Sequence, residues 1–155
     1  MKDFRIAVDD STFYWNVATE TTPLANDGGL GGAFYFAFVA KADYEYLCFF
    51  ERNSFIKNIA NASVNDFGIA GAGGGIYYQP TTNKGNCTLT DNIFLGNIAN
   101  FGGGILFKRG VNLLARGNIF MANEATINGG AASIQKINFS DNSSKYISKT
   151  PFRFL

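Results

Sequence analysis

The feature that most constrains this chain is the motif Phe-x-x-Asn-x-Ala, a Phe-x-x-Asn tetrad followed two residues later by Ala, which occurs four times. A glycine cluster lies downstream of each tetrad, and the seven residues before each Phe align without gaps. A fifth, partial copy aligns with Ser144 in the Phe position. Self-similarity of this kind predicts a repeat protein in which each copy packs on its neighbours. The tetrads are Phe13–Asn16, Phe55–Asn58, Phe94–Asn97 and Phe120–Asn123.

Two columns ahead of the tetrad are apolar, and the positions beside them are mixed or polar. A period of two is typical of a strand with one buried face. The column seven residues before the Phe holds Ile6, Cys48, Cys87, Leu113 and Ile137. The column five residues before it holds Val8, Phe50, Leu89, Ala115 and Phe139.

An asparagine column lies two residues before the Phe, with Ser11 in the first copy. An Asn amide at a turn can bond its own backbone and, in a stack, the amides above and below it. The glycine clusters predict a further corner, where the backbone needs positive φ or close packing. We therefore predict a structural ladder formed by Asn53, Asn92, Asn118 and Asn142.

The shortest copies run from Phe94 to Phe120, 26 residues, and from Phe120 to Ser144, 24 residues, a length that suits three short strands and three turns. We predict an all-β chain that folds as one right-handed parallel β-helix of about five such coils and forms a segment of a longer protein. A helical-hairpin repeat would need long stretches of good helix formers, which this Gly-, Asn- and Phe-rich chain lacks. The expected domain spans residues 1–155, with coils at 1–46, 47–86, 87–110, 111–136 and 137–155.

The first two copies carry insertions between the tetrad and the glycines, at Thr19–Leu30 and Asn61–Ala72. Both are expected to leave the coil at the same corner and to lie beside each other. Repeat proteins often place binding loops at such an edge. Insertions that are merely tolerated at the surface are the simpler alternative.

The charge balance favours no polyanionic partner, because 13 basic residues nearly cancel 12 acidic ones. We expect no nucleic-acid partner and no direct membrane insertion, since the most apolar run, 33–50, is interrupted by Lys41, Asp43 and Glu45. Residues 1–10 lack the apolar core of a secretory signal. Histidine is absent, so the commonest general base and nitrogen ligand are missing. No metal and no cofactor are predicted.

The tetrads FYWN, FIKN, FLGN and FMAN, with the runs GGAF, GGGI, GGGI and GGAA, resemble the FxxN and GGAI motifs of the chlamydial polymorphic outer membrane protein repeat. The likeness spans roughly Ile6 to Asn142, with Gly or Ala variants of the GGAI unit. Similar repeats occur in large surface proteins of protists, and the broader fold family is the pectin-lyase-like β-helix. The resemblance implies an extracellular or cell-surface scaffold for adhesion or assembly. The expected partners, neighbouring repeats of the same or an identical chain, follow instead from the unpaired strand edges that an open stack of coils leaves at its ends.

Many β-helices cleave acidic polysaccharides with outward carboxylates, and this chain has one such cluster. Asp9, Asp10, Glu51 and Asp91 fall in two adjacent columns with Arg52 among them. The spacing of Asp10 and Asp91, two coils or roughly 9.6 Å, is near the upper limit used by inverting glycosidases. A solvated charge patch in which Arg52 relieves repulsion explains the same residues. No enzyme is therefore predicted, with polysaccharide cleavage kept as an alternative.

Carbohydrate binding is a second alternative, since outward-facing aromatic rings could stack on sugars. Trp15 is the candidate ligand contact because its column also holds Lys57, Gly96 and Ala122, a pattern that favours exposure. The further aromatic candidates are Tyr14, Tyr77 and Tyr78.

Asn-x-Ser/Thr sequons could carry N-glycans, with Asn61, Asn86 and Asn138 as candidate sites and a fourth sequon at Asn142.

Cys48 and Cys87 lie above one another in an apolar column. We expect two buried thiols, because parallel side chains would hold their Cβ atoms too far apart for a disulfide.

Overall fold

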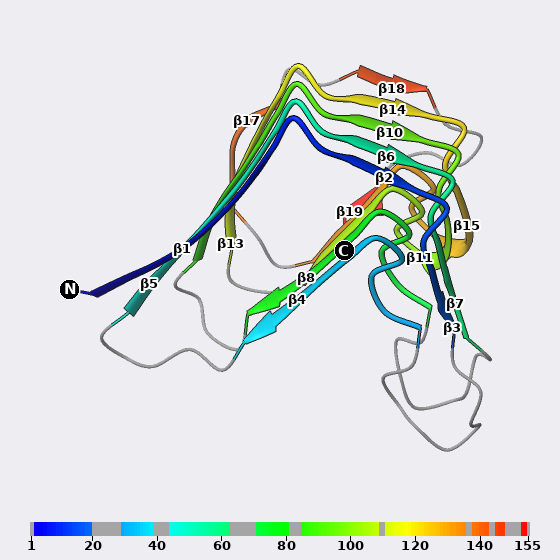
Figure 1. Ribbon diagram of the computed structural model, residues 1–155, viewed down its shortest axis with the longest axis horizontal. Helices are drawn as coiled ribbons and strands as arrows, with labels where there is room; N and C mark the ends of the chain where they lie inside the picture. Colours follow the sequence, from blue (N-terminus) through cyan, green and yellow to red (C-terminus); the bar gives the residue numbers. More distant parts are fainter. Residues whose placement is uncertain are drawn as a thin grey trace.

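The computed structural model describes residues 2–19, 29–38, 44–62, 71–80, 85–108, 111–135, 138–142, 145–147 and 153–154. Each of these segments contributes to a stack of parallel strands, and the coils follow one another along a single axis (Figure 1). The predicted all-β class and right-handed parallel β-helix are thus confirmed. No helix long and apolar enough to span a membrane occurs in the described part of the chain.

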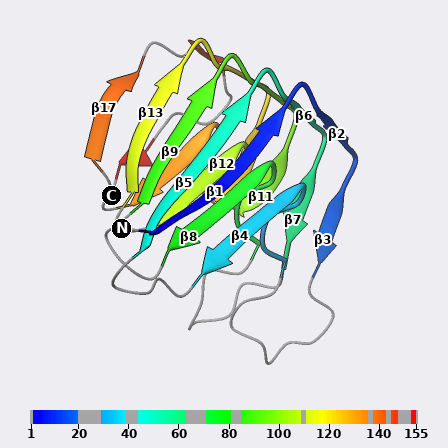
Figure 2. The ribbon, with the colours of Figure 1, turned by 60° about the vertical axis from the view of Figure 1, so that its left-hand side comes forward.

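Four sheets, rather than the predicted three, run along the stack (Figure 2). The first contains β1 (Lys2–Asp9), β5 (Tyr44–Glu51), β9 (Gly85–Thr90), β13 (Val111–Arg116) and β17 (Asn138–Asn142). The second contains β2 (Thr12–Tyr14), β6 (Ser54–Ile56), β10 (Ile93–Leu95), β14 (Ile119–Met121) and β18 (Lys145–Ile147). The third contains β3 (Val17–Thr19), β7 (Ile59–Asn61), β11 (Ile98–Phe101) and β15 (Glu124–Asn128). The fourth contains β4 (Phe34–Phe38), β8 (Ile76–Pro80), β12 (Ile105–Lys108), β16 (Ala132–Gln135) and β19 (Arg153–Phe154).

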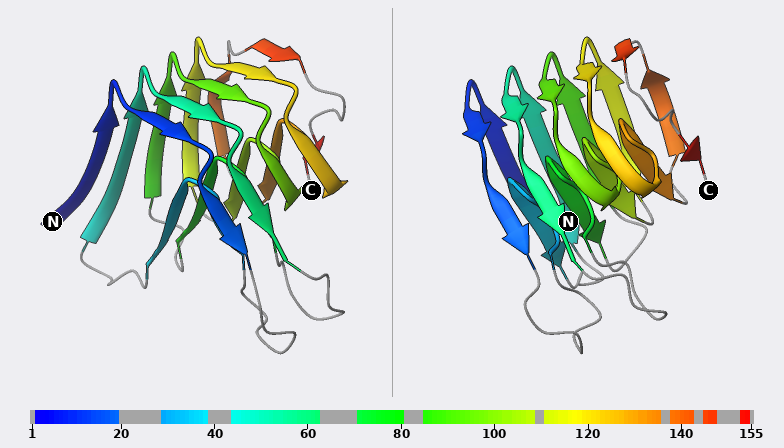
Figure 3. Two further views of the ribbon diagram at one scale, coloured as in Figure 1. Left: turned by 45° about the vertical axis from the view of Figure 1, so that its right-hand side comes forward. Right: turned by 90° about the vertical axis from the view of Figure 1, so that its right-hand side faces the viewer.

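The additional strand is the three-residue segment centred on each tetrad Phe. It was not expected because the sequence pattern suggested a single turn beside the tetrad, whereas the chain bends on both sides of it. In the second coil the bends lie at Arg52 and Lys57, which both adopt positive φ, 52° and 54°. Each strand of the second sheet is therefore short and bounded by two corners (Figure 3).

The register of the first four coils follows the repeat alignment. Ile6 pairs with Cys48, Cys48 with Cys87, and Cys87 with Leu113. The predicted coil starts at 47 and 87 fall inside β5 and β9, two to three residues late, because the strands extend ahead of the apolar columns to Tyr44 and Gly85.

The fifth coil has a different register from the predicted one. Phe120 pairs with Tyr146, so Tyr146 and not Ser144 occupies the Phe position. Asn142 pairs with Ala115 inside β17, after a register shift, and does not continue the column of Asn118. An aromatic residue matches this column better than a serine, and the expected Asn142 rung is therefore wrong. The side chain of Asn142 lies outside the described residues.

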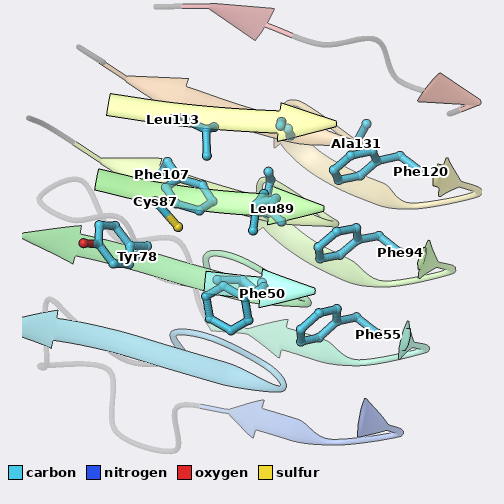
Figure 4. Close-up of a cluster of buried hydrophobic side chains, with 14 of the residues drawn as sticks. Phe50, Phe55, Tyr78, Cys87, Leu89, Phe94, Phe107, Leu113, Phe120 and Ala131 are labelled. Carbon is cyan, nitrogen blue, oxygen red and sulfur yellow. The ribbon is translucent and has the colours of Figure 1, made fainter. Parts of the chain in front are cut away.

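The core of the stack contains a column of phenylalanines that runs through the four tetrads. Figure 4 shows its three members from the second to the fourth coil, Phe55, Phe94 and Phe120. Phe13, Phe55, Phe94 and Phe120 stack face to face, with ring centroids 4.9, 4.8 and 4.6 Å apart and interplanar angles of 3° to 5°. Phe55 and Phe94 are fully buried, whereas Phe13, in the first coil, is only partly buried. Offset or parallel stacking of this kind adds to the free energy of area burial.

The glycine clusters form a corner of each coil, as predicted. Gly73 and Gly102 adopt positive φ, 69° and 63°, which glycine does without steric cost. In each of the first three coils, the next glycine packs against the backbone of the following coil. A Cβ at Gly74 would collide with the carbonyl oxygen of Gly103.

Cys48 and Cys87 form a disulfide between β5 and β9, so the expectation of two free thiols is wrong. Their Cα atoms are 4.6 Å apart, within the range that a disulfide allows. The expectation treated the two side chains as strictly parallel, but neighbouring side chains in a column can tilt toward each other. Both cysteines are buried in the core.

The two insertions leave and return at the same corner. Thr19 pairs with Asn61 where they leave, and Leu30 forms a bridge with Ala72 where they return. Most of each insertion lies outside the described residues.

Candidate functional site

The first asparagine ladder follows the corner between the sheets of β1 and β2. Asn53, Asn92 and Asn118 are fully buried there. The Oδ1 of Asn92 accepts from the backbone N–H and the Nδ2 of Asn53, both at 3.0 Å. The Nδ2 of Asn92 donates to the Phe50 carbonyl at 2.8 Å and to Asn118 Oδ1 at 2.9 Å. The structure thus brings three of the four predicted residues together, and Ser11 ends the row by donating its N–H to Asn53.

A second ladder, which the sequence analysis did not predict, follows the corner between the sheets of β2 and β3. It consists of the tetrad asparagines themselves. Asn58 Oδ1 accepts from the N–H and the Nδ2 of Asn16, and Asn58 in turn donates to Asn97 Oδ1 at 2.9 Å. Asn97 bonds Asn123 in the same way. The constant spacing of Phe and Asn in the four tetrads was the sequence signal that could have predicted this second ladder.

The residue before each ladder position bends the chain with a positive φ. Five of these eight residues carry side chains larger than Ala, which seldom adopt this conformation. The amides behind them supply the hydrogen bonds that hold the bend. The corner residues are Asp10, Arg52, Asp91 and Gly117 at the first corner and Trp15, Lys57, Gly96 and Ala122 at the second.

The predicted carboxylate cluster is an exposed ion-pair network centred on Arg52. Its guanidinium contacts Asp9 at 2.6 Å, Asp10 at 2.8 Å and, in addition, Glu51. The hydrogen bond from Arg52 lowers the pKa of Asp10, and the same hydrogen bond to Asp10 raises the pKa of Arg52. Asp91 is exposed and lies outside these three pairs. A carboxylate that a guanidinium holds ionised, as Arg52 holds Asp10, is poorly suited to act as a general acid.

The four aromatic candidates divide into two pairs. Tyr77 and Tyr78 are buried and cannot offer their faces to a sugar. Trp15 and Tyr14 are 59% and 56% exposed, with ring centroids 6.2 Å apart, and Lys57 lies over the Trp15 ring. Trp15 and Tyr14 therefore remain as an accessible aromatic pair on the first coil.

The sequons differ in how accessible their amides are. Asn61 is exposed at the end of β7. Asn86 is half-buried and its amide bonds Glu45 and Asn112, at 2.6 and 2.9 Å. Asn138 lies in β17, and its side chain is outside the described residues.

Within the described ranges, no group of three or more His, Cys, Asp or Glu residues is arranged to hold a metal ion. No family model matches the chain, and neither a curated protein nor a solved structure shows significant similarity to it.

Proposed function

We propose that this chain is a non-catalytic structural module, a segment of an extracellular or cell-surface scaffold used for adhesion or assembly. The observation that carries the proposal is that the buried polar groups serve the stack itself. Every fully buried asparagine amide of the two ladders bonds the coils beside it. Such an interior gives a rigid rod with an exterior free to vary, as in other repeat proteins.

The disulfide supports an oxidising location for the chain. Disulfides persist outside the cell and in secretory compartments and are rare in the cytosol. The Cys48–Cys87 bond lies deep in the core, where it fastens the second coil to the third. An exposed sequon at Asn61 would suit glycosylation in a eukaryotic secretory pathway.

The proposed partners are further coils of the same repeat, in the same chain or in an identical one. Strands β1 to β4 are all edge strands at one end of the stack, and unpaired edges favour association. At this end Phe13 has a neighbouring ring on one side, Phe55, and Asn16 is exposed although its counterparts are buried. Both residues would be completed by another coil of this type.

Sizing the 155-residue chain by light scattering over the micromolar range tests this end-to-end association. We expect mass that grows with concentration beyond two copies, and Phe13→Lys should stop that growth by placing a charge on the phenylalanine stack. Ala7→Lys, on the exposed outer face of β1, is the matched control. A chain that stays monomeric, or growth unaffected by Phe13→Lys, would contradict the proposal.

Polysaccharide cleavage or binding is the second candidate, favoured by the outward carboxylates and by the exposure of Trp15. Incubation with polygalacturonate, followed by an assay of new reducing ends, distinguishes polysaccharide cleavage from a non-catalytic role. We expect no turnover. Turnover that disappears in Asp91→Asn would make the chain an enzyme.

A further inference from the structure

The outer face of the second sheet is an apolar strip that continues around the corner beside it. Along β2, β6, β10 and β14, the third position of each strand holds Tyr14, Ile56, Leu95 and Met121. Tyr14 and Met121 are 56% and 40% exposed, and the adjacent Ile93 and Ile98 are each 38% exposed. Contiguous exposed apolar surface on a soluble protein marks an interaction site.

Both corners that border this strip are uneven along the stack. At the second corner, the first two coils present Trp15 and Lys57, whereas the third and fourth present Gly96 and Ala122. Large side chains therefore project from this corner in the first two coils, and small residues occupy it in the next two. At the first corner, the second coil presents Arg52 and the third presents Asp91.

We propose that two copies of this chain pair through this strip with their axes antiparallel, so that the first coil of each lies opposite the fourth coil of the other. In this arrangement Trp15 of each copy lies over the small Ala122 of the other, and Lys57 lies opposite Gly96. Shape complementarity thus arises from the same surface used twice, as a two-fold interface requires.

The charges of the first corner agree with the same arrangement. Pairing the second coil with the third places Arg52 of each copy opposite Asp91 of the other. Asp91 is the cluster carboxylate outside the ion pairs that Arg52 makes within its own copy. A parallel arrangement in register would turn the first corner of each copy against the second corner of the other. Arg52 would then lie opposite Lys57, and this contact between like charges is unfavourable.

Rigidity favours the pairing, because both corners are fixed by buried asparagine ladders and little order need be gained on binding. The strip is small: three residues give about 10 Å of width, and four coils give about 19 Å of length. An interface of this size is smaller than those of stable complexes, and we expect weak pairing, with a dissociation constant on the order of hundreds of micromolar. This side-by-side pairing stops at two copies, whereas association through the coil ends can continue. The pairing does not depend on the end-to-end association.

Sedimentation equilibrium over about 1 µM to 1 mM, on the Phe13→Lys background that blocks end-to-end growth, tests the pairing. We expect a monomer–dimer equilibrium that stops at two copies. Trp15→Ala should weaken it at least tenfold, because a buried Trp is a typical hot spot. Tyr35→Ala is the matched control, since Tyr35 is 52% exposed but lies on the sheet of β4. Equal effects of the two variants, or no dimer at all, would overturn the proposal.

A size exchange along the corner makes the test specific for the antiparallel register. Ala122→Trp alone sets two tryptophans against each other and should abolish the dimer. Its corner has φ 52°, and the corner of Trp15 has φ 54°, so the backbone there accepts a tryptophan. Mixing Trp15→Ala chains with Ala122→Trp chains should give a heterodimer, detected by native mass spectrometry, with circular dichroism as the check of folding. Failure of the two folded variants to combine would refute this register.

Discussion

At the scale of single residues, the buried asparagines supply the hydrogen bonds that the backbone cannot make at the corners of the coils. A backbone amide at a corner has no strand partner, and the Asn Oδ1 of the next coil accepts from it. Leaving such a group without a partner inside the protein would cost about 1 to 3 kcal/mol. The corners therefore depend on the ladders more than on local turn propensity.

Asn92→Ala tests this dependence. The change removes the amide that bonds Asn53, Phe50 and Asn118, and we expect the free energy of unfolding to fall by about 3 kcal/mol. Asn112→Ala, at an exposed amide, is the control, with an expected loss below about 1 kcal/mol. Chemical denaturation measures both. A loss at Asn92 no larger than at Asn112 would mean that the ladder does not stabilise the stack.

The second corner offers a matched pair of substitutions that isolates backbone strain. Ala122 adopts φ 52°, and Ala122→Gly should raise the free energy of unfolding by about 0.5 to 1 kcal/mol, because glycine accepts this conformation freely. Gly96→Ala, one coil away at φ 63°, should lower it by a similar amount, since a Cβ there meets only the Lys57 side chain, at 3.7 Å. Changes of the same sign in thermal or chemical melts would refute the strain account.

At the scale of strands and coils, the repeat columns predicted the stack because side chains in neighbouring coils face the same environment. Ile6, Cys48, Cys87 and Leu113 share one inward-facing column, half-buried at Ile6 and buried at the other three, and an alternation with period two was enough to find it. The fourth sheet was missed because strands of three residues carry little pattern of their own. The fifth coil was misaligned because the gap-free alignment places Ser144 at the Phe position, whereas in the structure the backbone of Phe120 pairs with Tyr146.

Only that part of the candidate site was predictable whose residues occupy neighbouring positions in the aligned repeat columns. The charge patch around Arg52 followed from its position between Asp10 and Asp91, since corner residues of successive coils stack. The burial of Tyr77 could not be predicted from the columns. Tyr77 packs in a second, smaller cluster with Ala72 and Leu106, on the outer side of the fourth sheet. No pattern within a single strand reveals packing on that side.

The disulfide between β5 and β9 closes a loop of 39 residues and should be a large local contribution to stability. The Cys48→Ala, Cys87→Ala double variant should lose about 3 to 4 kcal/mol of unfolding free energy by the chain-entropy model. A reducing agent should lower the wild-type midpoint to that of the variant and leave the variant unchanged. Alkylation in denaturant without prior reduction, followed by mass measurement, checks the bond. Labelling of both cysteines in the denatured, unreduced chain would show that it is absent.

At the scale of the whole molecule, stability is a sum over coils and the contacts between neighbours. A tandem duplication of residues 94–119, which span one repeat from Phe94, should therefore fold and raise the thermal midpoint by at least about 2 °C. The control carries Ala in place of Asn97 and Asn118 in the added copy. Calorimetry measures both. A duplication that melts below the parent, or no better than its control, would contradict additivity.

The two ladders also give the rod an electrical direction. In each rung the Oδ1 points toward the preceding coil and accepts from it. The Nδ2 lies on the opposite side of the amide and donates to the Oδ1 of the next coil, as well as to a backbone carbonyl of the preceding one. Side-chain amide dipoles aligned in this way add as peptide dipoles do in a helix, and each rung polarises the next. The end at β1 to β4 is then the negative pole, and an approaching cationic group would be drawn to that end before it touched any side chain.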